Sequence, residues 1–184
     1  MKNLLAIFLV ALTTFSAYAQ DASNQKIEPT DPFYQKGQHF LGLNAGGSTG
    51  YGFSYKYLKN KVSFQLTGIP IFSEDDIYTS VGVQLTRRIG HSSFNNDPIH
   101  FNVYTGAHHI YNSYTSYIYP DYVGSTPQQT TSSDQQVNIA VGFGLEYIAM
   151  KKLSLNFNAG YGVRLDGAPA TFFSAEAGIH YRLN

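Results

Sequence analysis

Cysteine and tryptophan are both absent from this 184-residue sequence, and charged residues make up only 13% of it. Without cysteine the chain can form no disulfide scaffold and can carry no cysteine-linked lipid anchor. The low charge content is unusual for a soluble protein, which must wet its whole outer surface. Basic and acidic residues number 12 each, so the sequence has no net positive charge with which to bind nucleic acid.

Long apolar runs are also missing after the first 20 residues. The early apolar run, residues 4–12, follows Lys2 and precedes a small-x-small motif formed by Ala17 and Ala19. This order predicts a secretory signal peptide over residues 1–19. The run is too short to cross a bilayer as a helix, so we expect export rather than helical anchoring.

Most of the remaining sequence alternates between apolar and small polar residues, and the alternation is clearest between positions 137 and 183. One parity of the first segment is apolar: Val137, Ile139, Val141, Phe143, Leu145 and Tyr147. The other parity is small or polar: Asn138, Ala140, Gly142, Gly144 and Glu146. A period of two predicts β-strands with one apolar face.

The same alternation divides the chain into eight expected strands. They cover residues 39–46, 51–58, 62–69, 77–89, 99–111, 136–149, 153–165 and 170–183. Most are long enough for a tilted strand to cross a bilayer. Residues 20–37 have two prolines, mixed charge and no period, and we expect them to form a short periplasmic segment. The barrel domain is then predicted over residues 38–184.

The connectors between these strands alternate in character. One set, expected on the periplasmic side, comprises residues 58–61, 87–98 and 150–152. The other set, expected outside, comprises residues 47–50, 70–76, 112–135 and 166–169. Basic residues gather near the first set and acidic residues near the second, which is consistent with eight strands running up and down.

On these features the chain resembles the small bacterial outer-membrane β-barrels of the OmpA/OmpX-like kind. The resemblance implies an all-β, eight-stranded antiparallel transmembrane barrel with short periplasmic turns and one long extracellular loop. It also implies a monomer in the bacterial outer membrane, surrounded by membrane lipids and lipopolysaccharide. Members of this family usually end in an aromatic residue that the barrel-assembly machinery recognises, whereas here the last aromatic residue, Tyr181, is displaced inward from the end.

An eight-stranded barrel encloses a narrow lumen that side chains fill. Charged groups on the lumen-facing parity are expected to be paired, because an isolated buried charge is costly. We therefore predict an internal network in which Glu146 and Glu176 meet some of Arg88, Arg164 and Arg182. We expect this network to plug the lumen and stiffen the barrel. The alternative interpretation is that the lumen charges line a narrow ion-conducting pore.

The long expected loop, residues 112–135, is rich in tyrosine. It contains Tyr114, Tyr117, Tyr119 and Tyr122 among serine, threonine, asparagine and glutamine. Tyrosine among small polar residues forms surfaces that bind partners at low entropic cost. These tyrosines are therefore candidate contacts for an extracellular ligand, and the alternative is an aromatic belt or a rigid hairpin at the barrel rim.

Lipid A modification is an enzymatic alternative, since some small outer-membrane barrels carry it out. It requires a serine activated by a histidine and an acid. His109 and Ser113 could supply the first two groups, with Asp121 or Asp134 as the acid, but the deacylase family has a His-x-Ser spacing. Residues 91–93 have that spacing and are expected at the opposite, periplasmic rim.

A metal site is not expected, because the adjacent residues His108 and His109 point to opposite faces of a strand and His100 cannot join both. A secreted lipocalin-like carrier, with its apolar face turned inward, is a less favoured alternative fold. The sequence therefore predicts a non-enzymatic outer-membrane barrel without cofactors, with a structural role or a role in adhesion and envelope integrity.

Overall fold

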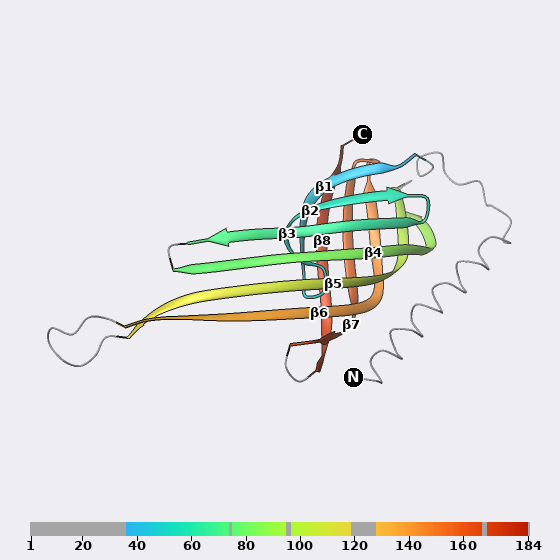
Figure 1. Cartoon of the computed structure of the whole chain (residues 1–184). Helices are drawn as coiled ribbons and strands as arrows, with labels where there is room; N and C mark the ends of the chain where they lie inside the picture. Colours follow the sequence, from blue (N-terminus) through green and yellow to red (C-terminus); the bar gives the residue numbers. More distant parts are fainter. Residues whose placement is uncertain (1–35, 74, 95–96, 119–127, 167–168, 184) are drawn as a thin grey trace. The chain divides into compact units, whose positions relative to one another are not determined.

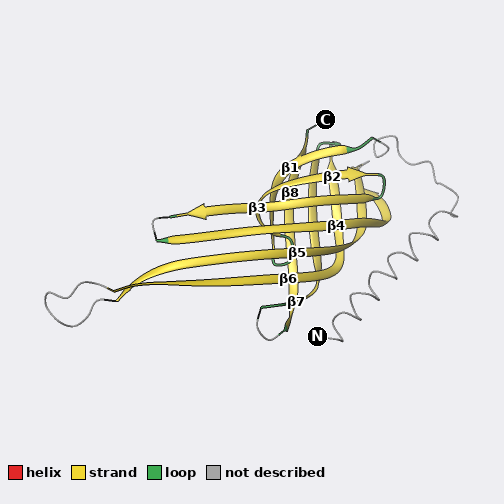
Figure 2. Cartoon of the chain, viewed as in Figure 1, coloured by secondary structure: helices red, strands yellow, loops and turns green. Residues whose placement is uncertain are grey.

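The computed structural model describes residues 36–73, 75–94, 97–118, 128–166 and 169–183. The regular structure of this part consists of eight β-strands that close into one barrel, as Figure 1 shows and as Figure 2 shows by secondary structure. Each strand is antiparallel to the next, and the last strand pairs with the first. Among the described residues, no helix is long and apolar enough to span a membrane.

The strands follow one another around the barrel in chain order. Their bounds are β1 (Gln38–Gly46), β2 (Gly50–Lys59), β3 (Val62–Phe72), β4 (Asp76–Phe94), β5 (Asp97–Ile118), β6 (Gln128–Ala149), β7 (Leu153–Arg164) and β8 (Ala170–Arg182). Each strand therefore pairs with the strand before it and the strand after it in sequence. This order confirms the predicted eight-stranded antiparallel up-and-down fold. Residues 1–35, which include the expected signal peptide, lie outside the described residues.

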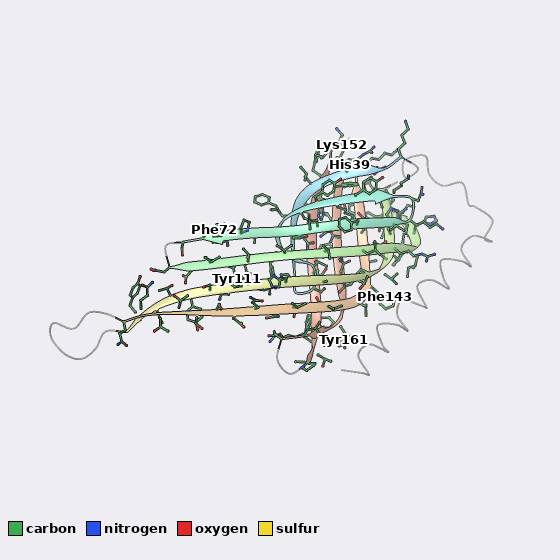
Figure 3. All side chains as sticks on the ribbon, in the orientation of Figure 1. His39, Phe72, Tyr111, Phe143, Lys152 and Tyr161 are labelled. Carbon is green, nitrogen blue, oxygen red and sulfur yellow. The ribbon has the colours of Figure 1, made fainter. Side chains whose placement is uncertain are left out.

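The apolar parity of each strand faces outward and the polar parity faces the lumen. Along β6, Val141 is 54% exposed and Phe143 68% exposed, whereas Asn138 and Glu146 are buried. Figure 3 shows Phe143 and Tyr161 directed away from the barrel. Buried polar side chains outnumber buried apolar ones in the described residues. This protein is thus apolar outside and polar inside, the reverse of a soluble barrel.

Two expected connectors are largely strand. Residues 87–98 were predicted as a periplasmic connector, but β4 continues to Phe94 and β5 begins at Asp97. Likewise, β5 continues to Ile118 and β6 begins at Gln128, within the expected loop 112–135. Alternating hydrophobicity ends where a strand has no apolar surroundings to face, although the backbone pairing continues. The pattern therefore marks the strand ends too early.

Four strands extend beyond the others at one end of the barrel, as Figure 1 shows. The pairing of β2 with β3 ends at Phe53 and Gly68, and the pairing of β6 with β7 ends at Asn138 and Arg164. Beyond these points β3, β4, β5 and β6 pair only with one another. We call this extension the protruding sheet and define it as residues 69–72, 76–80, 110–118 and 128–136.

Candidate functional site

An apolar cluster lies in the lumen near the end of the barrel that carries the short turns. Phe40 of β1, Leu58 of β2 and Ile148 of β6 point into the barrel and pack together. Phe40 and Ile148 are completely buried. We call this cluster the inner seal.

A buried ion pair lies next to the inner seal along the lumen. Lys56 of β2 and Glu146 of β6 approach to 2.5 Å between Nζ and Oε1, and both side chains are buried. The Ser154 hydroxyl donates to the same carboxylate oxygen at 2.6 Å. The charge of Glu146 is therefore compensated by one cation and one hydroxyl, as a buried carboxylate requires.

Tyr104 and two glycines narrow the middle of the lumen. Gly142 of β6 and Gly160 of β7 are paired in the register and face inward. A Cβ atom at Gly142 would lie 2.7 Å from the Tyr104 ring and 2.2 Å from the Ala159 carbonyl oxygen. A Cβ atom at Gly160 would lie 2.2 Å from the Val141 carbonyl oxygen. Only glycine fits at both positions, because the backbone of the paired strand and, at Gly142, the tyrosine ring occupy the space that a side chain would need.

The β1–β2 turn, residues 47–49, folds into the outer half of the lumen. Ser48 and Thr49 are completely buried, although residues between barrel strands usually lie on the surface. Glu176 of β8 accepts hydrogen bonds from the Ser48 amide (3.2 Å), the Ser48 hydroxyl and the Thr49 hydroxyl (2.8 Å). Gln84 and Asn158 donate to it as well. The carboxylate of Glu176 thus binds the turn through uncharged donors.

The other side of the turn is bound by β5 and β6. His108 Nδ1 lies 3.0 Å from the Gly47 carbonyl oxygen, and the Asn138 amide donates to the same oxygen at 3.0 Å. Because Nδ1 must carry the proton to donate to a carbonyl, Nε2 accepts, and the Ser80 hydroxyl at 2.8 Å is its donor. Ser80 in turn accepts from the Tyr51 amide. This Ser80–His108 pair is fully buried and its hydrogen bonds hold the turn in place.

The predicted network of Glu146 and Glu176 with some of Arg88, Arg164 and Arg182 stays a prediction, and the structure shows the following contacts of these groups. Glu146 pairs with Lys56, and Glu176 binds the β1–β2 turn. Arg164 lies at the outer rim, where its Nε is 3.6 Å from Asp166, and Arg182 donates to the Lys151 carbonyl at the opposite rim. Arg88 lies beside a β-bulge that shifts the β4–β5 register between Arg88 and Gly90. Arg88 is opposite the buried Asn102 in the β4–β5 register and its Nε is buried, whereas Arg164 and Arg182 are the last residues of β7 and β8. Parity predicts which face of a strand a residue is on and does not predict whether it lies at the rim.

Two of the predicted loop tyrosines lie on the protruding sheet. Tyr114 and Tyr117 of β5 are each 46% exposed. The Tyr117 hydroxyl donates to Asp75 at 3.0 Å, and the Thr115 amide donates to the Asp75 carbonyl at 2.9 Å. The β3–β4 hairpin is thereby attached to β5. Tyr119 and Tyr122 lie outside the described residues.

The residues considered for lipid A chemistry do not form a catalytic arrangement in the described part of the chain. His109 and Ser113 both lie on β5, four residues apart, and no hydrogen bond joins them. Asp134 lies on β6 opposite Asn112, and Asp121 is outside the described residues. Residues 91–93 lie on β4 near the short-turn end. The described residues also contain no group of three metal-ligating side chains.

No protein-family model and no curated protein sequence matches this chain. Several solved structures have a similar backbone. The N-terminal β-barrel domain of Pseudomonas aeruginosa OprF is 15% identical, with 80% of this chain and 96% of that chain covered and a TM-score of 0.45. The attachment invasion locus protein Ail of Yersinia pestis is 15% identical (80% and 97% covered, TM-score 0.41), and neisserial surface protein A is 16% identical (79% and 94% covered, TM-score 0.37). At such identities the similarity concerns the fold and assigns no residue a role.

Proposed function

We propose that this protein is a monomeric bacterial outer-membrane barrel that acts as a closed, non-enzymatic anchor for a surface-exposed sheet. The observation that carries the proposal is the outward apolar face on every strand around a polar, hydrogen-bonded interior. Lipid acyl chains match such an exterior, and a closed barrel satisfies every backbone hydrogen bond within the membrane. Residues 1–19 are then the export signal, and the barrel-assembly machinery inserts the mature chain among membrane lipids and lipopolysaccharide.

The interior supports an anchor rather than a carrier or a pore. A lipocalin-like carrier needs an apolar cavity, whereas the lumen here is lined by polar groups such as Asn156, Gln65 and Glu176. A pore needs a continuous aqueous path, and three buried groups that lie in the lumen argue against one: the inner seal, the Lys56–Glu146 pair and the β1–β2 turn. The function therefore resides in the surfaces that the barrel displays.

The protruding sheet is the surface best suited to contact an extracellular partner. Its β6 edge, residues 128–136, pairs with β5 on one side and has no strand on the other in the described part of the chain. Such an edge offers free backbone donors and acceptors to an extended segment of a partner. The exposed tyrosines Tyr114 and Tyr117 lie on the adjacent strand and supply rigid contact area. We propose adhesion or envelope protection through this sheet.

Shortening the protruding sheet is expected to remove surface binding and leave the barrel folded. A variant lacking residues 114–132, with Ser113 and Ser133 joined by Asn-Gly, keeps the paired register of β5 and β6. The barrel of this variant is expected to keep its heat-modifiable migration on gels, because the deleted residues contact no lumen group. Adhesion of producing cells to host-cell layers and survival in serum are the readouts.

The matched control is a variant in which glycine and serine replace residues 119–127, so that β5 and β6 keep their full described length. This control is expected to retain the interaction carried by the β6 edge and by Tyr114 and Tyr117. If the shortened variant adheres and survives in serum as well as the full-length protein, the protruding sheet has no role in surface interaction.

A further inference from the structure

We infer that the β1–β2 turn is a removable plug, latched by Glu176, whose release opens the outer half of the lumen as a blind, water-filled vestibule. The proposal goes beyond the anchor function, because it gives the barrel a second, open state. It depends on how the turn is bound, on the space that it fills, and on the seal that stays closed below it.

The turn is bound almost entirely by hydrogen bonds. Its hydroxyl and backbone groups contact Glu176 and Ser174 of β8, His108 of β5, Asn138 of β6 and Asn44 of β1. Water can replace each of these hydrogen-bond partners when the turn leaves. Glu176 contributes most, because its carboxylate accepts from both turn hydroxyls and from one backbone amide, and bonds to a charged group are the stronger ones.

The barrel wall leaves space for the turn. A Cβ atom at Gly82 of β4 would lie 2.2 Å from the Thr49 carbonyl oxygen, and one at Gly106 of β5 would lie 2.8 Å from the Ser48 carbonyl oxygen. The turn therefore occupies volume that lumen side chains would otherwise fill. When it leaves, that volume becomes a polar space and not a collapsed core.

The turn also has flexible ends. Gly46 precedes it, Gly47 is its first residue, and Gly50 and Gly52 follow it with φ angles of 92° and 117°. Glycine adopts these positive φ values without strain and changes conformation more easily than other residues. Such positions can absorb the backbone rotation that swings a short segment out of the lumen.

The lumen below the turn remains closed when the turn is released. The Tyr104 ring packs against Gly142, and the Lys56–Glu146 pair and the inner seal follow toward the short-turn end. The Lys56–Glu146 pair and the inner seal have no hydrogen bond to Ser48 or Thr49. The Tyr104 hydroxyl lies beside Ser48 and Ser174, so it borders the vestibule when the turn leaves. Release is therefore expected to admit water and small solutes to Glu176, His108 and Ser174, but not to Ser154.

The natural absence of cysteine provides a direct test. A single Ser174→Cys reporter lies behind the turn, where Ser174 is 2% exposed and 3.1 Å from the Ser48 hydroxyl. In the folded, reconstituted protein its modification by a cationic methanethiosulfonate reagent is expected to be slow. Adding Glu176→Ala is expected to accelerate it roughly tenfold or more, the effect of losing charge-assisted hydrogen bonds.

Thr49→Val is a second substitution that is expected to release the turn. It keeps the charge of Glu176, so no change of charge alters the reactivity of the reporter thiol. The control reporter is Ser154→Cys, which lies beside Glu146 and is completely buried. It is expected to stay slow in every background. The proposal is overturned if Ser174→Cys is modified no faster with either release substitution, or if both reporters accelerate together, since that would indicate general loosening of the barrel.

Discussion

Replacing Lys56 with alanine is expected to destabilise the folded barrel by about 3–5 kcal/mol. Lys56 Nζ lies 2.5 Å from Glu146 Oε1, and both side chains are buried. The substitution leaves the Glu146 carboxylate in the lumen with the Ser154 hydroxyl but without its cation. The measurement is the urea midpoint of unfolding in lipid vesicles, followed by loss of heat-modifiable migration.

The charge-removing double substitution Lys56→Met with Glu146→Leu is the control for this prediction. It removes both charges and leaves one neutral group, the Ser154 hydroxyl, without its acceptor. Because a neutral hydroxyl costs less than an unpaired charge, we expect the double substitution to recover most of the lost stability, as replacing a buried ion pair by apolar residues often does. If Lys56→Ala alone unfolds at the same urea concentration as the natural sequence, the pair does not neutralise Glu146 in the lumen.

Placing arginine at position 143 is expected to cost about 2–4 kcal/mol of stability in a bilayer. Phe143 is near the middle of the part of β6 that we propose to cross the membrane, and it is 68% exposed on the outer face of the barrel. Arginine there would meet hydrocarbon instead of water. The urea midpoint in vesicles is expected to fall, and the fraction of protein that inserts spontaneously is expected to fall with it.

Phe143→Leu is the matched control, because it keeps an apolar side chain at the same position. We expect it to change stability far less than arginine does. Equal stability of the arginine and leucine variants in vesicles would mean that position 143 faces water, and the proposed membrane location would then be wrong.

The sequence predicted the strands and their faces because each strand separates two different surroundings. Val141 and Leu145 are outward and Ala140 and Glu146 are inward, and this difference appears directly as a period of two. Where both faces of a strand are polar, as in residues 128–136, the period vanishes although the pairing continues. Residues 112–118 and 128–135 of the protruding sheet were therefore predicted as a loop.

The contacts inside the lumen could not be predicted in the same way. Parity says that Lys56 and Glu146 face inward, but their meeting across the barrel depends on the register and closure of eight strands. Ser48 and Thr49 can be buried because Gly82 of β4 and Gly106 of β5 leave room for the turn in the lumen. Both glycines are far from the turn in sequence. A glycine-flanked Ser-Thr turn was visible in the sequence, yet nothing local distinguishes a turn that enters the lumen from one that stays outside.

The most direct test of the proposed orientation in lipid uses the natural sequence. In lipid nanodiscs with methyl-labelled protein, nuclear Overhauser effects from acyl-chain protons report contact with lipid tails. The outward methyl groups of Val141 and Leu145 are expected to show these effects, and the inward methyl groups of Ala140 and Ile148 on the same strand are expected to show none. Acyl-chain contacts at Ala140 and Ile148, or their absence at Val141 and Leu145, would contradict a membrane barrel with a polar lumen.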